Sequence, residues 1–142
     1  MTINPIKQGN NTFCGPAVIS AITGISTDEA EAVINSVRGK DSDRKVTGVY
    51  NNELSKAFES LGWKAYNIPG VYGRTIYSLM FTMSIPGVYL FFVSHHVIAI
   101  EITISGRRYI IDNHTKNPLN LSNSARIGQK VIGVTRLEKV VV

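Results

Sequence analysis

The sequence predicts an α+β fold, with helices first and an antiparallel sheet afterwards, in one domain covering residues 1–142. Three observations support this prediction. Apolar residues recur at helical spacing between Cys14 and Met83, whereas the segment from Val88 to Val93, after Pro86-Gly87, is rich in β-branched and aromatic residues. No repeat, low-complexity stretch or linker divides the chain. Its 142 residues are the length of one domain with a sizeable core.

Four helices are expected in the first part of the chain. The first should begin at Cys14 to Pro16, because proline suits the first helical turn, and should end at Gly24. Since this segment is apolar nearly all round, we expect it to be a buried central helix. Three further helices, each with one apolar face, are expected over residues 26–39, 47–62 and 75–83.

The strands are expected after Pro86-Gly87, where the period of the pattern changes. They should cover residues 88–93, 96–104, 107–112 and 131–137. The second and third of these form a hairpin around the tight turn at Ser105-Gly106. A loop containing Asn117-Pro118 precedes the last strand, and the apolar tail Val140 to Val142 could add to a sheet edge in this chain or in another.

The chain has a net charge of +5 and a pI near 9.5, which could favour an acidic partner. However, the basic residues are scattered and form no block, and this is typical of a solvated surface. Aromatic residues are not interleaved with them, so nucleic acid is not an expected partner. The single cysteine excludes an internal disulfide framework.

The sequence also bears on where the protein is located. Residues 1–7 contain no apolar core long enough for a signal peptide. The longest apolar run, Val88 to Val93, is far shorter than the roughly 20 residues needed to span a bilayer. We therefore expect a cytoplasmic protein without a membrane partner. The sequence does not indicate an oligomeric state.

The stretch QGNNTFCGP at residues 8–16 contains the one cysteine, Cys14, at the start of the apolar helix. The positive end of a helix dipole favours the thiolate over the thiol, and the thiolate is the nucleophilic form. Cys14 is therefore a candidate nucleophile, although a small buried residue could equally pack there. Nucleophilic chemistry also needs a base within hydrogen-bond reach and a group that orients this base.

Three histidines could supply the base: His95, His96 and His114. The first two stand at the start of the second strand, where alternation sends them to opposite faces, so only one can face Cys14. His96 shares its face with three isoleucines. His95 shares its face with Glu101, which should make that side wetter. We favour His96 as the base and keep His95 as the alternative.

Asp112 ends the strand that returns from the hairpin turn, which should bring it beside His96. A carboxylate there can hold the imidazole in the useful tautomer and stabilise its charged form. Asn113, next along the chain, could take that role instead, and an Asp-Asn pair after a strand is also a common turn. Gln8 could donate its side-chain amide to an oxyanion, together with the backbone N–H of Cys14.

The stretches CGPAVISAI, SHHVIAIEI and RRYIIDN complete an order of four groups: a glutamine, a cysteine at a helix start, a histidine opening a strand and an aspartate after the next strand. In this order the sequence resembles the papain-like cysteine peptidases. Within that group it is most similar to the peptidases that process bacteriocin leaders at the front of export transporters, and also to small papain-like proteins of bacteriophages. The resemblance runs from Gln8 to Asp112 and implies a papain-like fold.

The resemblance also implies roles for site residues. These are Gln8 as oxyanion donor, Cys14 as nucleophile, His96 as base and Asp112 as the residue that orients the base. The sequence departs from the leader peptidases at Phe13, where they usually have aspartate, at Asn113, where they usually have proline, and at His95, where a small residue is expected. These departures weaken the similarity to the leader peptidases in particular, and with it the expectation of a double-glycine substrate. They remove no residue needed for thiol chemistry.

Three hypotheses about function follow. The first is a thiol hydrolase, that is, a cysteine peptidase or isopeptidase acting on a peptide or protein. If an amine rather than water accepted the acyl group, the same residues would make the protein an acyltransferase. The second is a non-catalytic papain-like binding or inhibitor module that recognises an acidic protein or nucleic acid. The third, a metal site, is disfavoured because adjacent strand histidines rarely bind one ion and no CxxC or HxxxH spacing occurs, so no metal or cofactor is expected. Trp63, Tyr66 and the loop 72–74 could form walls of a substrate pocket.

Overall fold

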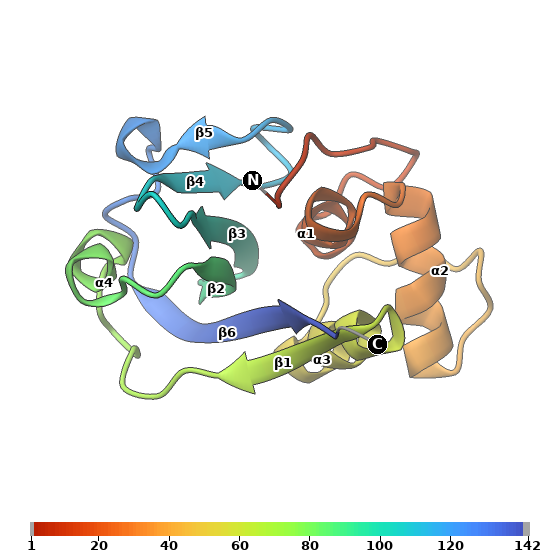
Figure 1. Cartoon of the computed structure of the whole chain (residues 1–142). Helices are drawn as coiled ribbons and strands as arrows, with labels where there is room; N and C mark the ends of the chain where they lie inside the picture. The colour runs from red at the N-terminus through yellow and green to blue at the C-terminus, as the bar shows by residue number, and fades with distance from the viewer. Residues whose placement is uncertain (1, 141–142) are drawn as a thin grey trace.

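The computed structural model describes residues 2–140, and its helices and antiparallel strands form the predicted α+β arrangement (Figure 1). The helices are α1 (Cys14–Thr23), α2 (Thr27–Arg38), α3 (Asn51–Ser60), α4 (Ile76–Thr82) and the short 3₁₀ helix η1 (Leu121–Asn123). The strands are β1 (Trp63–Asn67), β2 (Gly87–Val93), β3 (His96–Ile102), β4 (Arg108–Ile111), β5 (Leu119–Asn120) and β6 (Val131–Lys139).

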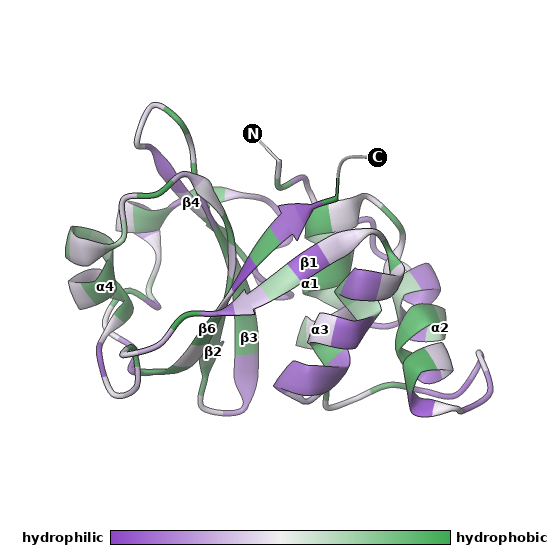
Figure 2. Ribbon diagram, turned by 60° about the horizontal axis from the view of Figure 1, so that its bottom comes forward, coloured by the Kyte–Doolittle hydropathy of each residue, from purple (hydrophilic) through white to green (hydrophobic). Residues whose placement is uncertain are grey.

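The sheet has six strands in the order β1-β6-β2-β3-β4-β5, and every neighbouring pair is antiparallel. Helices α1, α2 and α3 lie on one side of this sheet and α4 lies on the other (Figure 2). Each face of the sheet therefore has its own apolar core. Alternation along the strands supplies both cores: in β2, for example, Leu90 packs toward α1 and Phe91 packs toward α4.

Helix α1 is the buried helix that the sequence predicts. Eight of its ten residues, from Gly15 to Ile22, are buried, because it packs against β3 on one side and α2 on the other. Gly24 ends the helix in the left-handed region at φ 84°, where its N–H donates to the carbonyl of Ser20. This packing fixes the direction of α1, so that its N-terminus points at the start of β3.

The second helix, α2, begins with a capping box. Ser26 accepts from the backbone N–H of Glu29, and the carboxylate of Glu29 accepts from the N–H of Ser26. Gly39 ends α2 at φ 69°. The third and fourth helices also lie within their predicted ranges, and α3 begins directly after Tyr50.

Two strands and the 3₁₀ helix were not predicted from the sequence. Strand β1 interrupts the expected run of helices, and it contributes Trp63 to the core, where the ring packs edge-on against Phe58 with centroids 6.5 Å apart. The expectation of Trp63 as a substrate-pocket wall is therefore wrong. Strand β1 was not predicted because it is an edge strand that depends on pairing with the distant β6 and has no clear alternating pattern. Strand β5, at the other edge, has only two residues, which are too few to form a pattern.

The prediction that the Glu101 side of β3 is wetter is also wrong. Glu101 is buried, and its carboxylate accepts from the backbone N–H groups of Thr2 and Ile3. The N-terminal segment thus covers a charge that is satisfied by hydrogen bonds. In the apolar tail, Val140 donates its N–H to the carbonyl of Gly62, and residues 141–142 lie outside the described part of the chain.

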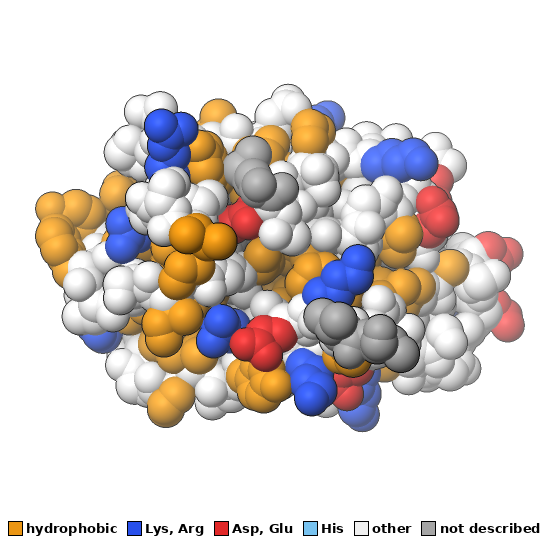
Figure 3. All heavy atoms as spheres, viewed as in Figure 1, with side chains coloured by type: hydrophobic (Ala, Val, Ile, Leu, Met, Phe, Trp, Pro, Cys, Tyr) orange, Lys and Arg blue, Asp and Glu red, His pale blue; other side chains and the backbone are white. Residues whose placement is uncertain are grey.

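The described surface shows no concentration of positive charge on the face in Figure 3, where Lys and Arg side chains stand apart from one another. Exposed apolar side chains lie over α4, where the rings of Tyr77 and Phe81 pack edge-on with centroids 4.9 Å apart. None of the described helices is both long and apolar enough to cross a membrane.

The close packing of Gly15, the residue after Cys14, leads to a prediction about stability. A Cβ at this position would come within 2.5 Å of Cγ2 of Val49. We therefore expect Gly15→Ala to lower the free energy of unfolding by roughly 1–3 kcal/mol through overpacking. Urea denaturation measures this loss. The double variant Gly15→Ala/Val49→Ala should recover part of the loss, and an equal loss in the single and double variants would contradict the account.

Candidate active site

Cys14 is the first residue of α1 and is half-buried, with its sulfur free. The N-cap residue, Phe13, makes no side-chain cap, so no side-chain oxygen of the N-cap occupies the N-terminus of the helix. The sulfur lies in the positive end of the helix dipole and beside the start of β3. This position suits a negatively charged sulfur.

The two adjacent histidines have different environments. A two-residue turn, Ser94 and His95, joins β2 to β3, and His96 pairs with Val93 as the first residue of β3. His95 has a left-handed backbone at φ 56° and an exposed side chain. The side chain of His96 is 12% exposed and interacts with Cys14. The structure therefore brings His96 to the cysteine, and His95 remains in the turn.

Asp112 follows β4 directly, and its side chain is only 1% exposed. Its Oδ2 lies 3.5 Å from Nε2 of His96. Its Oδ1 accepts from the backbone N–H groups of His114 at 2.8 Å and Thr115 at 3.0 Å. The loop thus fixes one carboxylate oxygen, and the other faces the imidazole. The two strand ends meet because the β3–β4 hairpin pairs Ala99 with Ile111.

The ionisation of Cys14 and His96 is coupled. Burial raises the pKa of the Cys14 thiol, but a hydrogen bond with His96, the backbone of Val97 and the charge of His96 together bring it below its ordinary value. Asp112 first, and then Cys14, raise the pKa of His96 to about 9, against burial and the charge of Arg126. These shifts favour a thiolate next to an imidazolium at neutral pH.

The contact between His96 and Asp112 is an ion pair rather than a short hydrogen bond. At 3.5 Å it is longer than a normal N–H···O bond, and Nε2 of His96 is buried with no partner at hydrogen-bond geometry. Asp112 therefore acts on the imidazole mainly as a nearby negative charge. Burial raises the pKa of Asp112, but His96, the N–H groups of Thr115 and His114, and the charge of Arg126 lower it overall, so the carboxylate is ionised.

Gln8 lies in the loop before α1 with its side chain exposed. Its amide nitrogen donates to the carbonyls of Gly9 at 3.1 Å and Asn11 at 2.6 Å. Both amide protons thus have partners within the loop. Asn11 is buried and donates to Glu31 and to the carbonyl of Val46, which fastens the loop to the helical layer.

Asn113, the alternative residue for orienting the base, points elsewhere. Its amide donates to the carbonyl of Thr12 at 3.1 Å, while its Oδ1 is buried without a partner. It therefore contacts the loop before Cys14, and no contact with His96 is found. Asp112 is the acidic neighbour of the imidazole.

Two neighbours of the site were not assigned to it from the sequence. His114, considered only as a possible base, is exposed and stacks on His96, with ring centroids 5.7 Å apart and planes inclined by 25°. Arg126, counted among the scattered surface charges, donates Nε to Oδ2 of Asp112 at 2.5 Å. His114, two residues after Asp112, could have been found from its spacing. Arg126 could not, because it arrives from a loop 14 residues further along the chain.

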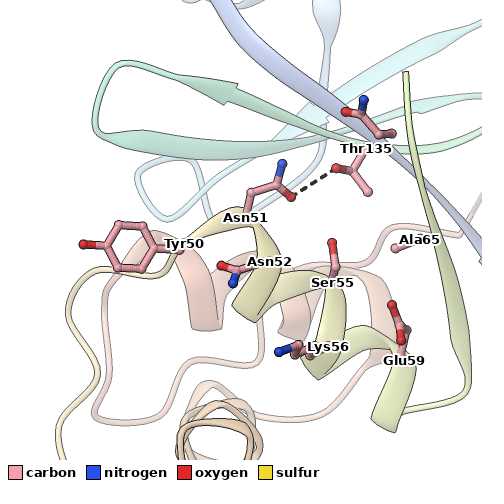
Figure 4. Close-up of a pocket in the computed structure, with 9 residues that line it drawn as sticks. Tyr50, Asn51, Asn52, Ser55, Lys56, Glu59, Ala65 and Thr135 are labelled. Carbon is pink, nitrogen blue, oxygen red and sulfur yellow. Dashed lines mark hydrogen bonds between the residues drawn. The ribbon is translucent and has the colours of Figure 1, made fainter. Parts of the chain in front are cut away.

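A hollow of about 690 Å³ lies between α3 and strands β1 and β6 (Figure 4). Amide, hydroxyl and charged side chains dominate its lining, and Asn51 accepts a hydrogen bond there from the hydroxyl of Thr135 at 3.2 Å. None of the predicted site residues lines it. Tyr66 is exposed and lies between two lining residues, Ala65 and Asn67, without lining the hollow itself. Among residues 2–140, no group of three or more His, Cys, Asp or Glu side chains is arranged to hold a metal ion.

The comparisons with known proteins reveal structural relatives only. No protein-family model matches the sequence, and no curated protein sequence matches it. Among solved structures, the chain is similar to a double glycine motif protease from an AMS/PCAT transporter, determined in complex with the leader peptide. The TM-score is 0.60 at 12% identity, over 98% of this chain and 94% of that one.

A second similar structure is the peptidase domain of Streptococcus ComA, a bifunctional ABC transporter involved in a quorum-sensing pathway. Its TM-score is 0.56 at 14% identity, over 97% of this chain and 98% of that one. Sequence identities this low show the fold alone. The chain therefore has the α+β, papain-like fold of these peptidase domains, as the sequence predicted.

Proposed function

We propose that the chain is a cysteine peptidase or isopeptidase in which Cys14 is the nucleophile, His96 the base and Asp112 the residue that orients the base. One observation carries the proposal: three ionisable groups from separate parts of the chain converge, with His96 between Cys14 and Asp112. The peptidase fold of the similar structures supports it independently.

The chemistry follows from the charges of the site. The Cys14 thiolate attacks a peptide carbonyl, and the C–N bond breaks as the His96 imidazolium gives its proton to the leaving amine. This leaves a thioester on Cys14 and a neutral imidazole. His96 then takes a proton from water, whose oxygen attacks the thioester, and the acid product and the thiolate–imidazolium pair are released. Asp112 stabilises the imidazolium before each proton transfer.

Gln8 is proposed as a donor to the oxyanion, with the backbone N–H of Cys14 as the second donor. For this role its amide must release the carbonyl of Asn11 or Gly9 when the substrate carbonyl arrives. We expect Gln8→Ala to lower kcat by roughly 10²-fold, because the charge on the oxyanion exists only in the transition state. Steady-state kinetics measures this effect.

The thiol itself should be unaffected in Gln8→Ala. Since Gln8 is not among the groups that shift the pKa of Cys14, the rate of its alkylation by iodoacetamide should match that of the parent. Slower alkylation in the variant would contradict an oxyanion role, as it would mean that the substitution disturbs the nucleophile.

The neighbour is a double glycine motif protease solved with a leader peptide, and this suggests the first substrate to test, a peptide that contains two adjacent glycines. We propose such a peptide, carrying a fluorogenic amide after the second glycine, as the probe. The parent protein should release the fluorophore from this probe. An aldehyde analogue of the same peptide should attach covalently to Cys14, which the intact mass of the protein detects.

Cys14→Ser is the matched control, because it changes only sulfur to oxygen. It should retain the fold, bind no aldehyde at a thiol and show no turnover above background. A set of glycine-free peptides and isopeptides tests other acyl donors in the same assay. Binding of peptides without cleavage of any, together with an unmodified Cys14, would overturn the peptidase proposal in favour of a binding module.

A further inference from the structure

Arg126 contacts the same carboxylate as His96 does. Its Nε lies 2.5 Å from Oδ2 of Asp112, the oxygen that faces His96 Nε2 at 3.5 Å. Oδ1 is occupied by two backbone N–H groups. Two cationic side chains therefore compete for one oxygen of a buried carboxylate, and in this arrangement the arginine is the closer of the two.

The position of Arg126 is built into its loop. Its backbone N–H donates to the hydroxyl of Ser124 at 3.1 Å, and its carbonyl accepts from the N–H of Gln129 at 2.9 Å. Its Nη1 also contacts the side-chain oxygen of Gln129 at 3.3 Å. The side chain of Arg126 is 20% exposed, so water screens its charge only partly from the carboxylate. These contacts leave Nε directed at Asp112.

We propose that Arg126 is a positioning residue that takes a share of the Asp112 carboxylate and so weakens the hold of Asp112 on the His96 imidazolium. This inference rests on the proposed thiol chemistry for its functional meaning, but not for its test. If Asp112 interacted with His96 alone, its carboxylate would stabilise the imidazolium more strongly, and His96 would hold its proton more tightly. The imidazolium would then be a poorer acid toward the leaving amine at neutral pH.

Two physical effects of Arg126 both weaken the hold of His96 on its proton. The positive charge of Arg126 itself disfavours a second positive charge on His96, and this lowers the pKa of the imidazole. The charge-assisted bond from Nε also takes one acceptor site of Oδ2 and part of the attraction of its charge, while His96 lies at the longer distance of 3.5 Å. The ionisable groups found to act on His96 or to contact it are Cys14 from α1, Asp112 and His114 from the end of β4, and Arg126 from the loop before β6.

The test is the titration of His96 by NMR in a Cys14→Ala background, where the imidazole no longer titrates together with a thiol. Arg126→Met removes the charge and the Nε donor while keeping much of the side-chain length. We expect the pKa of His96 to rise by roughly half a unit or more in this variant. Arg126→Lys keeps the charge and should give a smaller rise. Arg107→Met removes one charge from the far hairpin turn and should give none.

One outcome of the titration would contradict the inference. An unchanged or lowered pKa of His96 in Arg126→Met would overturn the inference, since Arg126 would then only anchor its loop or hold Asp112 in place for His96. Arg126→Gln repeats the test with a polar side chain if the methionine variant does not fold, as judged from its amide spectrum. Because no thiol is present, a failed peptidase proposal leaves this result unaffected.

Discussion

Replacing His96 by alanine should lower kcat/KM for the diglycine probe by roughly 10³-fold or more. The substitution removes the proton donor to the leaving amine and the positive charge that lowers the pKa of Cys14. Steady-state kinetics at pH 7 measures the loss. His95→Ala is the matched control, because the side chain of His95 is exposed in the turn before β3, and it should retain most of the parent activity.

The pair of variants also decides between the two histidines. If His95→Ala lost as much activity as His96→Ala, the assignment of the base would be wrong. The left-handed backbone at His95 makes the alanine variant slightly strained, so a glycine at the same position serves as a second control. Either variant should leave the contact between His96 and Asp112 intact.

Replacing Asp112 should affect both activity and stability. Asp112→Asn keeps an oxygen for the backbone N–H groups of His114 and Thr115 but removes the charge that faces His96. We expect kcat to fall by roughly 10²- to 10⁴-fold, because the imidazolium loses its partner. Kinetics on the diglycine probe measures this loss.

Asp112→Ala should in addition lower the free energy of unfolding by about 2–4 kcal/mol. It leaves Arg126 without its ion-pair partner in a mostly buried position and frees the loop that follows β4. Urea denaturation separates this loss from that of the asparagine variant. Asn113→Ala is the neighbouring control for catalysis, and a larger loss of kcat there than in Asp112→Asn would identify Asn113 as the orienting residue instead.

Much of the fold could be predicted because its signals are local. The boundaries of α1 and α2 follow from Pro16, the capping box and the two glycines that end these helices. The four interior strands, β2, β3, β4 and β6, follow from their apolar residues. Strand β1 could not be predicted, since a five-residue edge strand exists through its pairing with β6, more than 60 residues away.

The candidate site could be predicted in part, for a similar reason. Cys14, His96 and Asp112 each stand at the end of an element, so the hairpin and the helix start indicate where they meet. Arg126 reaches Asp112 from an irregular loop, which has no periodicity to place it. The environment of Glu101 was misjudged because its partners are backbone N–H groups of the N-terminal segment, and a side-chain pattern does not reveal them.

The thiolate–imidazolium pair is tested most directly by the rate of Cys14 alkylation with iodoacetamide across the pH range, in the parent and in His96→Ala. The parent should react fast well below pH 8.5, the ordinary range of a thiol, and its profile should change again near pH 9 as His96 loses its proton. In His96→Ala the reaction should shift to an ordinary thiol ionisation. A parent profile that already follows an ordinary thiol, and does not move in His96→Ala, would contradict the account.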